Sequence, residues 1–138
     1  MTGPSHRVLS ESEVLSRLKS RRGQPGYLAM FSSWLGGVIT DPALMQIPLD
    51  DHLVHRGHGV FDTCTLSGGN LYRLGVHMDR LLTSAALARI EHSWTKEDLI
   101  QMVMDTASHA RVKDGAVRYW LTAGPGGFSP SPQECDEP

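Results

Sequence analysis

Apolar residues recur at the spacing of an amphipathic helix in three parts of the chain. Two of these parts begin with the pattern of a capping box, Ser10-x-x-Glu13 and Thr95-x-x-Asp98, in which side chain and backbone satisfy each other at a helix start. Gly and Pro residues follow the first pattern, at Gly23 and Pro25, and indicate its end. The three predicted helices cover residues 11–22, 76–90 and 95–112.

Continuous or alternating apolar residues predict the strands. Residues 27–35 are predicted to form a buried strand that turns at Gly36-Gly37 into a short partner. Residues 59–74 form the clearest predicted hairpin, because β-favouring side chains flank the turn Ser67-Gly68-Gly69-Asn70. A last strand is predicted over residues 116–124.

The order of these elements is helix, two strands, hairpin, two helices and strand. This order predicts an α+β fold of two layers, with a mixed or antiparallel sheet and helices on one face. Residues 1–124 are expected to form this domain. Residues 125–138 are rich in Gly and Pro and are expected to be a loop that begins a connection to a further part.

The composition, net charge and cysteine count limit the partners and the compartment that we expect for this protein. The 138 residues are 40% hydrophobic and 20% charged, as in an ordinary globular domain. A net charge of −2 without a basic patch gives no reason to expect a nucleic acid or a membrane as partner. Two cysteines form no disulfide framework, so we expect a reducing compartment. The expected location is cytoplasmic, with a plastid or mitochondrion after removal of a transit peptide as the alternative.

Three histidines, His52, His55 and His58, suggest a metal site, because imidazole binds zinc and iron. The glycines Gly57 and Gly59 favour a turn rather than a helix here, so the rings need not converge. We therefore expect polar loop histidines and no metal.

The sequence gives little support for nucleotide binding or for a catalytic nucleophile. Neither a P-loop nor a G-x-G-x-x-G pattern occurs in the chain. Residues 122–129 could form an anion-binding nest, although such Gly-rich segments are more often plain loops. Cys64 is expected to be a small packed residue rather than a nucleophile.

The segment from Leu49 to Ile90 contains the turn Gly59-Val60-Phe61-Asp62, the hairpin glycines and the pattern H-x-x-R-L at residues 77–81. Together with residues 116–127, it resembles the N-terminal domain of the fold-type IV (class IV) pyridoxal-phosphate enzymes. These are the branched-chain aminotransferases, the D-amino-acid aminotransferases and the aminodeoxychorismate lyases. The resemblance is closer to the D-amino-acid aminotransferases and the lyases.

The resemblance implies a cofactor, pyridoxal 5′-phosphate, and site residues. The arginine of H-x-x-R-L binds the cofactor phosphate in that family, which implies this role for Arg80, assisted by His77 one turn earlier. A guanidinium can bind phosphate oxygens as a fork, and a nearby helix start would favour the anion. Phe61 and Arg118 match positions that face the substrate pocket.

One feature of the family has no counterpart here. The family's Schiff-base lysine lies on a second domain beyond an interdomain loop, whereas Lys19, Lys96 and Lys113 have no matching context. The resemblance therefore implies that the catalytic lysine is absent, that residues 125–138 are a shortened interdomain loop, and that this chain alone is inactive. The expected partners are small amino and keto acids and a second copy in a homodimer. The alternative is a non-catalytic binding or dimerisation module with the same fold.

Overall fold

The computed structural model describes residues 6–21, 26–128 and 135. Its elements, in chain order, are α1 (Glu11–Ser20), β1 (Met30–Ser32), β2 (Gly37–Ile39), the 3-10 helix η1 (Pro42–Leu44), α2 (His52–Arg56), β3 (Gly59–Ser67), β4 (Asn70–Leu71), α3 (Leu74–Leu87), α4 (Lys96–His109) and β5 (Gly115–Thr122). None of these helices has the length and apolar character that crossing a bilayer requires.

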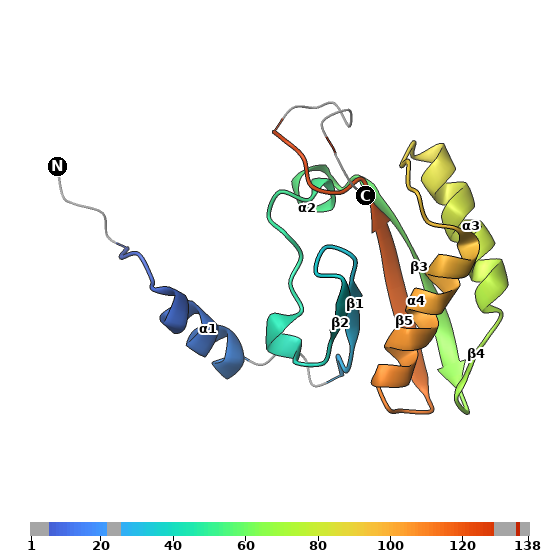
Figure 1. Ribbon diagram of the computed structural model, residues 1–138, viewed down its shortest axis with the longest axis horizontal. Helices are drawn as coiled ribbons and strands as arrows, with labels where there is room; N and C mark the ends of the chain where they lie inside the picture. Colours follow the sequence, from blue (N-terminus) through green and yellow to red (C-terminus); the bar gives the residue numbers. More distant parts are fainter. Residues whose placement is uncertain (1–5, 22–25, 129–134, 136–138) are drawn as a thin grey trace.

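The strands form two antiparallel sheets. The larger has the order β4-β3-β5, and β3 pairs with β5 from Gly59 opposite Thr122 to Leu66 opposite Gly115. The smaller consists of β1 and β2 alone. Figure 1 shows α3 and α4 side by side over one face of the larger sheet. The predicted α+β fold with helices on one face is confirmed. The sheet is antiparallel rather than mixed, and it is divided into two.

The core lies between the larger sheet and the two helices. Because side chains alternate along a strand, every second residue of β3 faces the helices, and Cys64 and Leu66 are buried there. Met78 and Leu81 of α3 belong to the same buried cluster as Cys64 and cover it from the helix side. Cys64 is fully enclosed, and burial raises the pKa of its thiol, so it behaves as a packed residue as expected.

Two predictions, the length of one strand and the conformation around His52, are wrong for local reasons. The strand expected over residues 27–35 is limited to β1, and Trp34 is 67% exposed rather than buried. The chain turns earlier than expected, because Gly36 N–H donates to the Ser33 carbonyl and Leu35 N–H to the Ser32 hydroxyl. The segment around His52 is the short helix α2 rather than a turn. Gly57 ends that helix in the left-handed conformation, with φ 64°.

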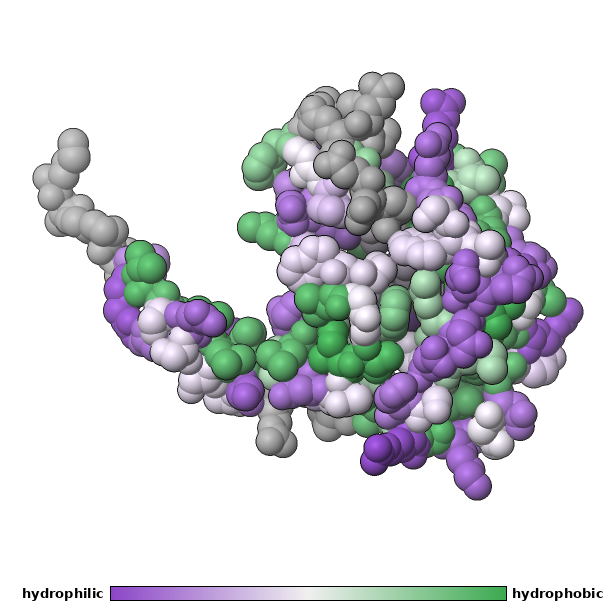
Figure 2. All heavy atoms as spheres, viewed as in Figure 1, coloured by the Kyte–Doolittle hydropathy of each residue, from purple (hydrophilic) through white to green (hydrophobic). Residues whose placement is uncertain are grey.

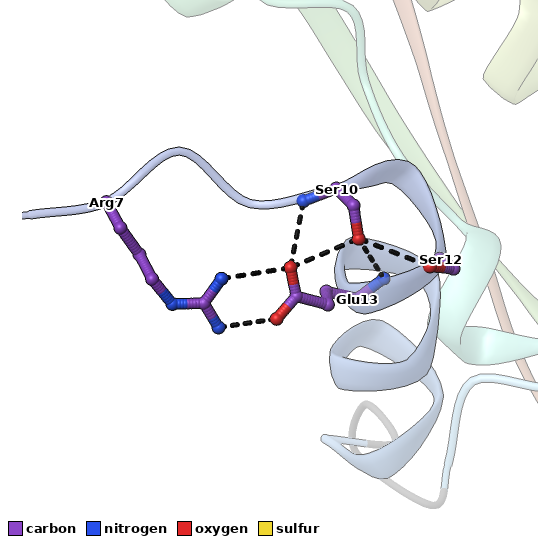
Figure 3. Close-up of polar contacts among 4 residues, drawn as sticks. All are labelled: Arg7, Ser10, Ser12 and Glu13. Carbon is purple, nitrogen blue, oxygen red and sulfur yellow. Dashed lines mark hydrogen bonds and ion pairs between the residues drawn. The ribbon is translucent and has the colours of Figure 1, made fainter.

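Helix α1 stands apart from the rest of the molecule (Figure 1). Its predicted capping box is present, and Figure 3 shows Ser10 and Arg7 both bonded to Glu13. None of its residues is buried, and it makes its contacts with η1 rather than with the larger sheet. The residues expected to end it, Gly23 and Pro25, lie outside the described residues.

Candidate functional site

The two predicted cofactor residues meet at one buried carboxylate. His77 and Arg80 are three residues apart on α3, so both side chains lie on the same face of the helix. The His77 Nδ1 lies 3.2 Å from Asp62 Oδ2, and the Arg80 Nε lies 3.6 Å from the same oxygen. Asp62 comes from the middle of β3, at a position that faces α3. The structure thus joins helix and strand through one anion and two basic side chains.

Asp62 has the partners that a buried carboxylate requires. Its side chain is 10% exposed, and its Oδ1 accepts a hydrogen bond of 2.7 Å from the Thr63 backbone N–H. Burial alone would raise the pKa of Asp62. The Thr63 N–H, the His77 ring and the charge of Arg80 outweigh that effect and hold the pKa below its ordinary value. Asp62 is therefore an anion at neutral pH.

Arg80 forms an ion pair at one end of its guanidinium and is open at the other. Its contact with Asp62 uses Nε, while its side chain is 68% exposed. The terminal guanidinium nitrogens are thus accessible to an anion from solvent. Arg80 also borders a shallow depression lined by Val76, Asp79, Thr83 and Ser84.

The expectation that a helix start assists Arg80 is wrong. Helix α3 begins at Leu74, two residues before the predicted start, and Arg80 lies six residues further along. The helix dipole acts mainly within the first turn, so it adds little at this distance. Any preference of this place for an anion rests on the side chains of Arg80 and His77.

Phe61 and Arg118, the predicted substrate residues, also lie together. The Arg118 guanidinium carbon is 5.3 Å from the centroid of the Phe61 ring, and its Nε donates 3.1 Å to the Thr63 hydroxyl. Because neighbouring residues of a strand point to opposite faces, Phe61 lies on the face away from Asp62. The structure brings each pair together but places the two pairs on opposite faces of the larger sheet.

The three lysines lie elsewhere. The Lys96 Nζ is 2.5 Å from Asp79 Oδ1, an ion pair between the first residue of α4 and α3. Lys19 is exposed on α1, and Lys113 lies in the turn between α4 and β5. Within the part of the chain that the structure describes, no hydrogen bond or ion pair connects a lysine to Asp62, His77 or Arg80.

The three histidines around α2 have separate partners. The His52 ring is fully buried, with Nε2 3.0 Å from the Gly127 carbonyl. His55 stacks against His52, and its other ring contact is a tilted one with Phe128. His58 turns away, with Nε2 2.9 Å from the Ala88 carbonyl. No group of three metal-ligating side chains occurs among the described residues. The histidines instead attach the segment after β5, and the end of α3, to the region of α2.

Asp62 is the site residue that sequence reasoning did not select. A signal was present, because Asp62 falls between Val60 and Cys64 in the inward alternation of the predicted hairpin. A charged residue at a core position requires a partner and is more informative than an exposed one. Tyr119, opposite Asp62 in β5, is a second polar residue of this region that sequence reasoning did not select. Its hydroxyl is buried and has no hydrogen-bond partner among the described residues. Burial raises the pKa of this hydroxyl, and the negative charge of Asp62 raises it further.

Comparison with known proteins relates this arrangement to one family. Residues 59–138 match the family described as Amino-transferase class IV. The chain is 50% identical over 131 residues to a chloroplastic D-amino-acid transaminase of Arabidopsis thaliana, which is 95% of this chain and 35% of that protein. The chain spans about a third of the length of the curated relatives it matches.

Two solved structures share the fold. A branched-chain amino acid aminotransferase of Escherichia coli matches with a TM-score of 0.63 and 21% identity, over 70% of this chain and 33% of that one. A 4-amino-4-deoxychorismate lyase from Pseudomonas aeruginosa matches with a TM-score of 0.54 and 24% identity, over 63% and 31%.

Proposed function

The chain belongs to the class IV aminotransferase family, and from this premise we propose that it forms the N-terminal part of a pyridoxal-phosphate-dependent aminotransferase of the D-amino-acid type. The observation that carries the proposal is the 50% identity to the Arabidopsis D-amino-acid transaminase over nearly the whole chain. The substrates would be small amino and keto acids, and the reaction the transfer of an amino group between them. Residues 1–124 would form the domain and residues 125–138 the start of the interdomain loop.

The side chains around Asp62 fit the phosphate of this cofactor. Arg80 offers an accessible guanidinium, which binds phosphate oxygens as a fork, and His77 adds a second nitrogen base on the same helix face. Arg80 and His77 would therefore hold the phosphate and orient the cofactor. When bound, pyridoxal phosphate supplies the electron sink for amino-group transfer.

Phe61 and Arg118 would contact the substrate from the other face of the sheet. The Arg118 guanidinium stacks on the exposed Phe61 ring, so a cation and an apolar surface are presented together. This combination suits a carboxylate with a small apolar side chain. Because the two pairs lie on opposite faces of the sheet, the proposal requires further protein surface to complete the pocket, from a second copy in a homodimer and from a second domain carrying the family's lysine.

A chimeric protein tests the proposal. The matched residues of this chain would replace the corresponding segment of the Arabidopsis relative, and amino transfer from D-alanine to a 2-oxo acid would be measured. We expect the chimera to be active and the 138-residue chain alone to give no turnover. A folded chimera that is inactive beside an active parent would contradict the proposed function.

Reduction with borohydride in the presence of pyridoxal phosphate tests whether any lysine of this chain forms the Schiff base with the cofactor. The isolated chain should show no stoichiometric label at Lys19, Lys96 or Lys113. A single dominant adduct accompanied by turnover would show that the chain contains its own catalytic lysine. The alternative function, a non-catalytic binding or dimerisation module, predicts that the chimera is inactive although it still forms a dimer.

The location of the protein is also part of the proposal. The Arabidopsis relative carries the description chloroplastic, which favours a plastid over the cytoplasm that the composition suggested. Fluorescent tagging of the protein as it is encoded would distinguish the two compartments.

A further inference from the structure

Among the described residues, Asp62 is the one carboxylate that contacts both proposed phosphate ligands, and nothing in the proposed function assigns it a role. The Asp62 Oδ2 lies 3.2 Å from the His77 Nδ1 and 3.6 Å from the Arg80 Nε. The carboxylate itself is held rigidly by the Thr63 N–H and by its place in the middle of β3. The guanidinium is thus attached to the sheet at one nitrogen, while its exposed end projects to solvent.

We propose that Asp62 is a positioning residue, which fixes the Arg80 guanidinium and the His77 ring in the orientation that receives a phosphate monoester. This inference rests on the proposed function, because it assumes that Arg80 binds the phosphate. An arginine side chain loses considerable rotamer freedom when it binds a ligand, and fixing it beforehand removes part of that cost. Asp62 also makes the Nε end unavailable, so the ligand must approach the terminal nitrogens.

Electrostatics alone predicts the opposite consequence for a substitution. Asp62 is a negative charge near the position of a dianion, so removing it should strengthen phosphate binding if it did nothing else. If Asp62 positions Arg80, removing it should weaken binding. The direction of the change therefore distinguishes a positioning role from a charge that is merely nearby.

The test uses the 138-residue chain and the probe 4-deoxypyridoxine 5′-phosphate, which carries the phosphate but lacks the aldehyde that bonds to lysines. Binding would be followed by NMR of the arginine Nε–Hε groups, with 4-deoxypyridoxine, which lacks phosphate, as the control ligand. We expect Asp62→Asn to weaken binding of the phosphate probe by about threefold to tenfold, which lies within the range of coupling between contacting residues. Binding of the control ligand should not change.

A double-mutant cycle with Arg80→Ala identifies the route of the effect. In the Arg80→Ala background, Asp62→Asn should cause no further loss. A loss of the same size in both backgrounds, or a gain of affinity in Asp62→Asn alone, would overturn the inference. If Arg80→Ala leaves the affinity unchanged, the phosphate anchor of the proposed function fails and the inference with it. If the unmodified chain does not bind the probe, the same four proteins are compared in the chimeric form, in which the pocket is complete, and the same outcomes decide.

A measurement without substitution covers the case in which Asp62→Asn does not fold. In the unmodified chain, the Arg80 Nε–Hε proton should exchange with water more slowly than that of the exposed Arg111, because the Arg80 Nε lies 3.6 Å from the buried Asp62 carboxylate, which limits its contact with water. Equal exchange rates would show that Asp62 does not hold Arg80. This result would overturn the inference while leaving the proposed function intact.

Discussion

At the scale of single residues, a buried acid sets the character of the site. Asp62 replaces what would otherwise be an apolar side chain between Val60 and Cys64 on the inner face of β3. Leaving such a group without partners would cost more than its hydrogen bonds contribute, so the basic residues of α3 are needed beside it. The same contact holds α3 against the sheet and directs Arg80, so one residue links stability to binding.

Arg80→Ala should weaken binding of pyridoxal phosphate in the chimeric protein by about 1.5–3 kcal/mol, the contribution of hydrogen bonds to a charged group. Arg80→Lys should restore only part of the loss, because an ammonium cannot form the two parallel bonds of a guanidinium. Absorbance titration measures both, and Arg56→Ala removes an exposed cation of α2 as the control. Equal affinity in all four proteins would show that Arg80 is an ordinary surface charge.

The lowered pKa of Asp62 predicts a particular pH dependence of stability. A carboxyl whose folded pKa is depressed stabilises the fold above its unfolded pKa, near the ordinary 3.8, and loses that contribution as the pH falls through the folded value. Asp62→Asn should therefore be less stable than the unmodified chain at about pH 6, by about 1–3 kcal/mol. The difference should shrink on acidification below the ordinary value.

Urea unfolding of both proteins over a range of pH measures this effect. The pKa of Glu13 is also lowered, to about 2, by its hydrogen bond with Arg7, but this group is present in both proteins and cancels from the difference. A difference in stability that does not change with pH would show that the ionised carboxylate of Asp62 contributes nothing to the fold.

At the scale of elements, the two capping boxes have different consequences. Thr95 and Asp98 cap α4, which buries Leu99 and Val103 in the core. Ser10 and Glu13 cap α1 in the same way, but that helix buries no residue. The same local motif thus starts one helix that is part of the cooperative unit and one that is outside it.

Thr95→Ala should lower the free energy of unfolding by about 1 kcal/mol, the usual contribution of an N-cap side chain. The matched control Ser10→Ala should leave the global value unchanged, since α1 can lose its helical structure without exposing the core. Chemical denaturation followed by the fluorescence of Trp34, Trp94 and Trp120 measures both. Equal losses in the two variants would mean that α1 unfolds together with the sheet.

At the scale of the whole molecule, α3 and α4 cover one face of the larger sheet and leave aromatic residues of the other face open. Phe61 is 60% exposed and Trp120, its partner in the β3–β5 register, is 50% exposed. In Figure 2 hydrophobic atoms also gather over the region of β1, β2 and η1, where Trp34, Leu35 and Ile47 are exposed. Of the three helices predicted over 11–22, 76–90 and 95–112, the first does not cover the sheet, because α1 lies apart from it.

The isolated chain should therefore associate with itself. Apolar patches beyond a few hundred Å2 commonly mark interaction surfaces, and this face has two aromatic residues beside each other. Sedimentation over a wide concentration range should show dimers or larger species, and the double variant Phe61→Ser, Trp120→Ser should reduce them. Leu87→Ser changes an exposed residue at the end of α3 and serves as the control. A monomer at every concentration would contradict this expectation.

Local patterns in the sequence were sufficient for several features. The capping boxes at Ser10 and Thr95, the hairpin at Gly68-Gly69 and the packing of Cys64 were predicted and are confirmed. Each depends on residues within about one helical turn or one tight turn, or on the alternation of a single strand, and such short-range physics is written in consecutive residues. The family, too, was recognisable from two continuous segments, residues 49–90 and 116–127.

The tertiary structure alone decided which residues meet. Asp62 faces His77 and Arg80 because β3 pairs with β5 and α3 lies on one face of that pair, contacts between segments far apart in the chain. Because the helices cover only this face, Phe61 and Arg118 lie on the opposite face from Arg80, and Trp120 remains exposed. A strand's alternation divides its residues between two faces, but it does not say which face the helices will cover. That choice depends on the packing of the whole domain, which no local pattern contains.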